Sequence, residues 1–242
     1  MILVDSLLYK IDQKLNKLST NAHQQIALED KILALNEAQI KLIKQKVDGG
    51  TNNQLGLDAS KKRYEDLQNL VISYNENNLD LKQVDKNLNQ WSADVTKLVP
   101  KYMFYLDSYV LADKGECKNR KIWINKDLTK HGDIQYLLNN VHYCPSFEYQ
   151  ETFNTISSNE ISIYTDGTFT PKKIKIMYMR YPVYIDKEGY TNFEGKSSIN
   201  QNCELATYLE DELLDLTVQN LAMYTENAAA VQSAAFRIQT NE

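Results

Sequence analysis

The sequence contains few of the residues that interrupt regular structure. Only 8 glycines and 4 prolines occur among 242 residues, and no stretch approaches the roughly 18 consecutive apolar residues of a membrane span. Residues 1–10 lack a basic leader and a small-residue cleavage site, so we expect no signal peptide, no membrane contact and a soluble protein. Low glycine and proline content is typical of proteins with long helices.

Residues that carry catalysis are also scarce. The chain has three histidines, and it contains neither a glycine-rich phosphate loop nor the pentapeptide of a nucleophile elbow. His142 and Cys144 stand two positions apart, but zinc sites usually combine two close pairs of ligands. The cysteines Cys117, Cys144 and Cys203 are far apart, which favours reduced thiols over a disulfide framework. We therefore expect no catalytic residue, no metal site and no cofactor.

Charge and aromatic content narrow the choice of partners. The net charge of -5 is dispersed and argues against a nucleic-acid-binding domain, which usually carries a basic stripe. The 16 tyrosines fit a protein that contacts other proteins over much of its surface. They fit a genome of biased base composition equally well.

Apolar residues recur three and four positions apart through the first hundred residues, which predicts helices. We expect a first helix up to Leu18, a second up to Val47 with a wide apolar arc, a third over residues 58–74 and a fourth over residues 80–98. Four amphipathic helices with short connections favour an antiparallel bundle over residues 1–100. The bundle is either self-contained, or its first two helices extend outward and pack on neighbouring subunits.

The pattern changes to alternation after Pro100, and residues 101–186 are expected to form a small, mainly antiparallel sheet. Residues 102–112 and 117–125 read as a hairpin with a turn at residues 113–116. A short helix over residues 133–141 and strands over residues 147–156, 160–164 and 174–185 complete this insertion. The predicted fold class is therefore α+β, with a small sheet inserted into a helical protein.

Residues 187–242 are expected to form a polar loop, a C-terminal helix from Asn202 to Met223, and a docking tail. Asp211 and Asp215 share one face of that helix, which is either solvated or a contact to basic residues of a neighbouring subunit. Phe236 and Ile238 are apolar residues in the tail. They indicate a peptide that docks on a partner, and the alternative is a frayed extension.

Three stretches carry a resemblance to a known family. They are residues 178–182 (YMRYP), residues 202–205 (NCEL) and residues 212–218 (ELLDLTV). In this pattern the chain resembles head–tail connector proteins, also called adaptor or ring proteins, of tailed bacteriophages of the crAss-like type.

The resemblance implies a structural virion protein without catalytic activity. About twelve copies would form a ring beneath the portal protein at one capsid vertex. The ring would bind other tail or ring proteins and extend the channel through which DNA passes at ejection, and its subunits would come from the host cytoplasm. Two alternatives remain open: an intracellular scaffold or partner-binding module without phage context, and an enzyme with a dispersed site.

Overall fold

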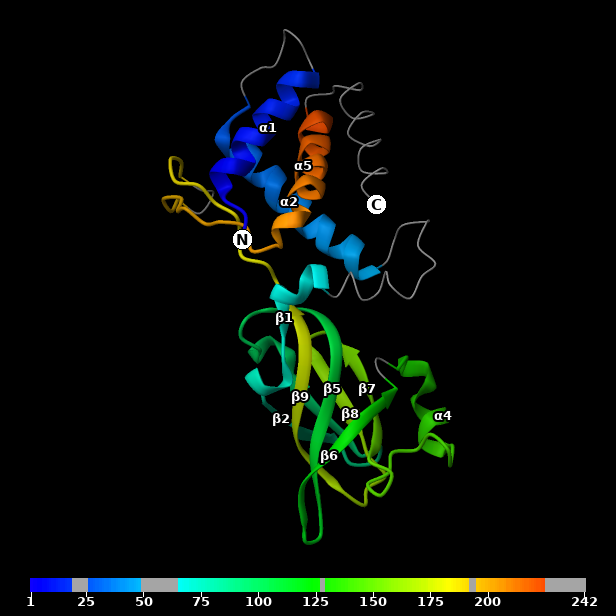
Figure 1. Ribbon diagram of the computed structural model, residues 1–242. Helices are drawn as coiled ribbons and strands as arrows, with labels where there is room; N and C mark the ends of the chain where they lie inside the picture. The colour runs from blue at the N-terminus through cyan, green and yellow to red at the C-terminus, as the bar shows by residue number, and fades with distance from the viewer. Residues whose placement is uncertain (19–25, 49–64, 127–128, 192–194, 225–242) are drawn as a thin grey trace. The chain divides into compact units, whose positions relative to one another are not determined.

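The computed structural model describes residues 1–18, 26–48, 65–126, 129–191 and 195–224, and the chain divides into two compact units (Figure 1). The helical unit contains residues 1–69 and 182–242, whereas the sheet unit contains residues 70–181. Both ends of the chain therefore belong to the helical unit. None of the described helices is long and apolar enough to cross a membrane.

The helical unit is built on α1 (Val4–Leu18), α2 (Leu28–Asp48) and α5 (Glu210–Tyr224), and α5 packs against both other helices. Each helix contributes a row of buried apolar side chains, as the sequence spacing predicts. These include Leu7, Ile11, Ile32, Leu35, Ile43, Leu213, Leu216 and Leu221. Every residue from Leu213 to Val218 is buried, so α5 is the central helix of this unit.

The described residues of the sheet unit form a nine-stranded sheet. The strands are β1 (Val71–Ile72), β2 (Leu79–Asp80), β3 (Lys82–Asp85), β4 (Gln90–Asp94), β5 (Tyr102–Lys114), β6 (Cys117–Lys126), β7 (Glu151–Ser157), β8 (Glu160–Tyr164) and β9 (Thr170–Arg180). Their order is β1-β9-β5-β6-β7-β8-β4-β3, with β2 also on β9. All pairs are antiparallel except β6 with β7.

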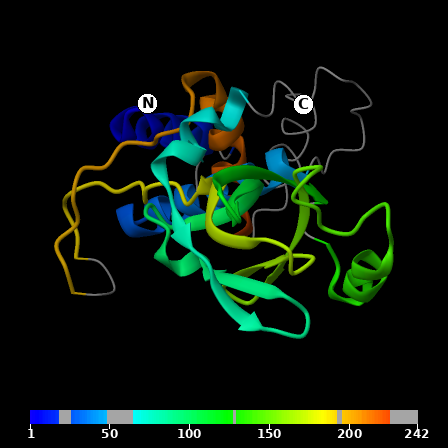
Figure 2. The same ribbon diagram turned by 90° about the horizontal axis from the view of Figure 1, so that it is seen from below.

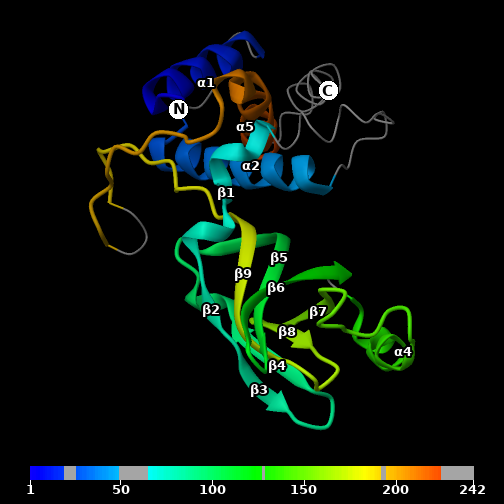
Figure 3. The same cartoon turned by 60° about the horizontal axis from the view of Figure 1, so that its bottom comes forward.

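The sheet curls until its two ends share one extended segment. Within this segment β2 pairs with β9, and β3, which follows after Leu81, pairs with β4. The curl encloses a core whose members are apolar side chains on the inward positions of the strands. They include Val110, Ile122, Ile161, Ile163, Ile174, Ile176 and Tyr178. The short helix α4 (Ile134–Asn139) packs Leu137 against Phe153 and Tyr164 at β7 and β8 (Figure 3).

The expectation of a helical bundle over residues 1–100 with a small inserted sheet is wrong. Residues 71–94 form strands β1 to β4, so the sheet is large and the fold is mixed α/β. The region expected to be a fourth helix is the β3–β4 hairpin, whose turn is stabilised by Asp85: its carboxylate accepts a hydrogen bond from the amide of Asn87 at 2.7 Å. Asn89 completes the turn with a φ of 47°. Turn-forming Asp and Asn side chains therefore override the helical spacing.

Two further element boundaries differ from the sequence expectation. The strand expected to reach residue 185 ends at Arg180, before Pro182. The C-terminal helix begins at Glu210, after a 3-10 turn over Thr207–Leu209, rather than at Asn202. Asn202 instead caps α1, because its side-chain oxygen accepts a hydrogen bond from the amide of Val4 at 3.0 Å. The hairpin of β5 and β6 and the helix near residue 134 are confirmed.

Candidate functional site

The groups that could carry catalysis do not converge in the part of the chain that the structure describes. His131 and His142 are both exposed, and these residues contain no cluster of His, Cys, Asp or Glu suited to a metal ion. All three cysteines are free. Cys203 is fully buried, and burial raises the pKa of its thiol to about 11. A hollow of about 540 Å³ beside α4 is lined by Gln135, Tyr136, Asn139, Asn140, Val141 and His142.

The residues expected at a subunit contact have different surroundings. Asp211 is exposed on α5. Asp215 is buried, and its carboxylate lies 2.7 Å from the ammonium group of Lys14 on α1. Of the two alternatives for this face, solvation does not hold for Asp215, which pairs with Lys14 inside the helical unit. The contact of Asp211 with a neighbouring subunit stays a prediction. Phe236 and Ile238 lie outside the described residues.

Glu65, Asp66 and Glu212 lie near Tyr208, and Asp211 adjoins them in the first turn of α5. We call Glu65, Asp66, Tyr208, Asp211 and Glu212 the acidic patch. The ammonium group of Lys46 forms ion pairs with two of these carboxylates, at 2.7 Å from Glu212 and 3.4 Å from Asp66. Desolvation of the Tyr208 hydroxyl, with the neighbouring Asp66 carboxylate, raises the pKa of Tyr208 to about 12. Glu65 and Asp211 are exposed. Counted over the residues that the structure describes, the patch therefore has more carboxylates than ammonium groups.

Residues 186–191 and 195–201 form an arm beside the three helices (Figures 1 and 2). It is held to α1 by Lys187, whose ammonium group lies 2.8 Å from Asp5. Its base is closed by the paired backbones of Asp186 and Gln201. The buried carboxylate of Asp186 accepts hydrogen bonds from the Tyr190 hydroxyl at 2.6 Å and from the Ile199 amide at 3.1 Å. Large apolar side chains nevertheless remain exposed at the arm and just before it, namely Val183, Tyr184 and Ile199. The arm thus has a fixed base, and apolar side chains on it and just before it are open to solvent.

The outward side of three strands in the sheet unit carries a second exposed surface, which we call the lysine–aromatic face. One row across β9, β5 and β6 is Lys175, Tyr109 and Trp123, and the next row is Lys173, Leu111 and Lys121. Directly paired residues on adjacent strands share a side of the sheet. Their neighbours Val110, Ile122 and Ile174 are buried in the core, so these two rows point outward.

Lys121 lies over the aromatic rings of this face. Its ammonium group is 3.7 Å from the ring centre of Trp123 and 3.9 Å from that of Tyr109. Tyr74 packs its ring 5.1 Å from that of Tyr109, and its hydroxyl donates a hydrogen bond to Asp107. These cation–π and ring contacts fix the aromatic side chains in place.

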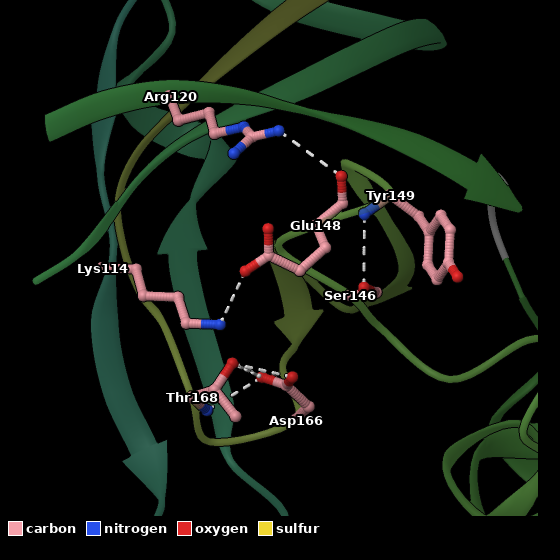
Figure 4. A network of polar contacts seen from close by, with 7 residues as sticks. All are labelled: Lys114, Arg120, Ser146, Glu148, Tyr149, Asp166 and Thr168. Atoms are coloured by element: carbon pink, nitrogen blue, oxygen red, sulfur yellow. Dashed lines mark hydrogen bonds and ion pairs between the residues drawn. The ribbon is translucent and has the colours of Figure 1, made fainter. Parts of the chain in front are cut away.

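A polar cluster at the far end of the β5–β6 hairpin holds the loop before β7 (Figure 4). Lys114 pairs with the carboxylate of Glu148 at 3.0 Å, and Arg120 donates to the backbone oxygen of Glu148 at 3.4 Å. The guanidinium of Arg120 also lies 4.9 Å from the ring centre of Phe147. The partners come from both the hairpin and the loop, so the cluster fixes the loop to the sheet.

The two units differ in formal charge. Residues 70–181 contain 14 Lys and Arg and 13 Asp and Glu, a net charge of +1, whereas the helical unit contains 13 and 19, a net charge of -6. In the sequence the charged residues appear dispersed, so the net charge of -5 does not reveal this difference between the units. The lysine–aromatic face could not be predicted from the sequence, because its three lysines become neighbours only through the pairing of β9, β5 and β6.

No family model matches the chain, and a search of curated proteins found no match either. Two observations therefore bear on function: the surfaces formed by the described residues, and the three sequence stretches that resemble phage connectors.

Proposed function

We propose that this chain is a structural protein of a tailed phage that assembles into a ring. The ring joins the portal protein to the tail and extends the DNA channel, and it acts by binding rather than by catalysis. Its partners are further copies of itself, the portal protein and other tail proteins.

The arm is the observation that carries this proposal. Exposed Ile199 on the arm, with exposed Val183 and Tyr184 just before it, is costly for a protein that remains monomeric, because exposed apolar patches promote association. Each of these side chains stabilises a contact once it is covered, by about 1.5–3 kcal/mol for full burial. The hydrogen bonds of Asp186 lower the entropy that the arm loses on binding, since its base is already fixed.

The sequence resemblance supports the same function. Residues 178–182 run from the end of β9 to the first residue of the helical unit, and residues 202–205 lie directly before the turn that leads into α5. Two of the three resembling stretches therefore flank the arm on either side. In a ring, this part of each subunit would form the contact between neighbours.

Native mass measurement of the purified protein, alone and with a portal protein, tests the proposal. We expect a discrete ring of about twelve copies that binds the portal. Changing both Val183 and Ile199 to Asp should shift the population to monomers, because carboxylates replace the apolar contacts.

Val141→Asp is the matched control, since Val141 is exposed beside α4 in the sheet unit. A wild-type monomer that does not bind the portal would contradict the proposal and favour a partner-binding module without phage context.

A further inference from the structure

We infer that the lysine–aromatic face of one copy binds the acidic patch of a second copy. The inference rests on the proposed function, in which the arm contacts a neighbouring subunit, and it adds a second pair of surfaces to the contact between neighbours. A ring needs a heterologous contact, in which two different surfaces of the same subunit meet. The chain carries two such surfaces of opposite charge.

The lysine–aromatic face carries positive charge, and few carboxylates among the described residues pair with its lysines. Lys173 and Lys175 lie on β9 and Lys121 lies on β6, on either side of Leu111 and Tyr109 on β5. Among the described residues, Asp80 is the only carboxylate paired with any of these lysines, and it lies 3.9 Å from Lys173 with its own side chain 80% exposed. The three lysines bring positive charge to one side of the sheet, so an anionic partner is favoured here.

Trp123 supplies an apolar anchor within the same face. It is 46% exposed although its ring is 5.8 Å from that of Tyr109 and is held by Lys121. Tryptophan and tyrosine side chains that are fixed before binding are typical centres of protein interfaces. The face therefore combines a rigid aromatic centre with lysines at its margin.

The acidic patch has the complementary character. Lys46 is shared by Asp66 and Glu212, and among the described residues no other basic side chain pairs with a carboxylate of the patch. Asp66 is 2% exposed, and neither of its carboxylate oxygens accepts a hydrogen bond from the described residues. A buried carboxylate without full compensation is costly, and positive charge brought by a partner lowers that cost. Exposed Tyr208 gives this patch an aromatic side chain of its own.

Charge complementarity makes a second copy the occupant of the face. The helical unit carries a net charge of -6 and the sheet unit +1, so two copies attract each other when unlike units meet. Single-stranded nucleic acid would also match lysines beside aromatic rings. The overall charge of -5 opposes a polyanion and also a second copy, but a polyanion is negative throughout, whereas a second copy can place its own negative patch against the lysines at short range.

Paired charge reversals test the contact. One variant carries Lys173→Glu with Lys175→Glu on the face, and the other carries Glu65→Lys with Asp211→Lys on the patch. Analytical ultracentrifugation should show each variant associating with itself about tenfold or more weakly than the wild type. Their equimolar mixture should recover wild-type association to within about threefold, because a reversed face then meets a reversed patch.

Lys82→Glu with Lys86→Glu is the matched control, since both lysines are exposed in the sheet unit outside the face. Thermal unfolding of every variant shows whether the units remain folded. The variants at residues 173 and 175 leave Lys121 and its ring contacts in place, which limits the effect on folding.

Three outcomes overturn the inference. Wild-type protein that does not self-associate overturns it, even if the monomer binds the portal as the proposed function requires. Unchanged assembly of both variants overturns it while leaving the ring intact. Loss of oligonucleotide binding by the lysine variant with unchanged self-association assigns the face to nucleic acid. Conversely, an assembled ring that responds to the charge swap but never binds a portal contradicts the proposed function alone.

Discussion

The two units place charge in opposite ways. The helical unit buries three carboxylates, those of Asp66, Asp186 and Asp215, and pairs α5 with lysines from α1 and α2. Every buried polar side chain that the structure describes in the sheet unit is neutral, being Ser, Thr or Asn. The lysines of its outward face have little to pair with. Charge therefore stabilises packing inside one unit and remains available for binding on the other.

The difference follows from how each kind of element satisfies its backbone. Adjacent strands satisfy one another's amides, so the interior of the sheet unit needs only short polar side chains. One example is the bond from the Asn154 amide to the Tyr105 hydroxyl at 3.0 Å. Helices satisfy their backbones internally, and long side chains such as Lys14 and Lys46 are then free to reach across to carboxylates on α5.

The largest effect is expected from breaking the buried pair of Lys14 and Asp215. The side chain of Asp215 is 4% exposed and that of Lys14 is 23% exposed. Lys14→Met leaves a buried carboxylate without its ammonium partner and should lower the free energy of unfolding by about 3 kcal/mol. Asp215→Asn leaves an ammonium group that can reach water, so we expect about 1 kcal/mol. Urea unfolding at constant salt measures both.

Lys31→Met is the control for this comparison. Its partner Asp12 is 47% exposed, so the loss should stay below about 1 kcal/mol. Equal losses for Lys14→Met and Lys31→Met would show that burial does not set the strength of these pairs.

A smaller loss of stability is expected from removing a side-chain amide that bonds to the backbone, an arrangement found in both units. The side-chain amide of Asn77 pairs with the backbone N–H and C=O of Ile176 on β9, in the gap between β1 and β2. Asn36 on α2 does the same for Ile185, with both hydrogen bonds at 2.8 Å. Alanine at either position leaves two buried backbone groups without partners, and we expect a loss of about 2 kcal/mol in each unit.

Asn75→Ala provides the control, because Asn75 is exposed and its loss should lie within about 0.5 kcal/mol. If the losses at Asn36 and Asn77 differed severalfold, the amide device would not be equivalent in the two units.

Sequence reasoning succeeded where one local pattern determines the structure. The rows of apolar residues in α1 and α2, and the turn at residues 113–116 between β5 and β6, were predicted from spacing alone. It failed at residues 80–98, where Leu81, Val95 and Leu98 have helical spacing but lie in or beside short strands. Those strands depend on β8 and β9, which are distant in sequence, so no local window contains the deciding contacts.

The candidate site was less predictable than the fold. Asp211 and Asp215 were assigned to one face by helical spacing, but only the packing of α1 shows that Asp215 faces Lys14. Asn202 was predicted to cap the helix that follows it in sequence. It caps α1 instead, which lies about two hundred residues earlier in the chain. The acidic pattern was thus visible in the sequence, whereas its partners were not.

The smallest effect on the protein is expected from alkylating its thiols, which compares one cysteine from each unit. Cys117 in the sheet unit is exposed, whereas Cys203 in the helical unit is fully buried and has a pKa of about 11. At pH 8 only about one in a thousand Cys203 thiols would be ionised, and the thiolate is the reactive form. Iodoacetamide should therefore modify Cys117 long before Cys203, as peptide mass analysis over time would show.

Unfolding in urea should bring the two rates together, because it removes the burial of Cys203. The backbone of Cys203 pairs with Ile2 in both directions, at 2.9 and 3.0 Å, so its protection also reports whether the start of the chain is docked. Rapid modification of Cys203 in the folded protein would show that this pairing opens readily. The helical unit would then be looser at its N-terminus than the paired backbones of Ile2 and Cys203 indicate.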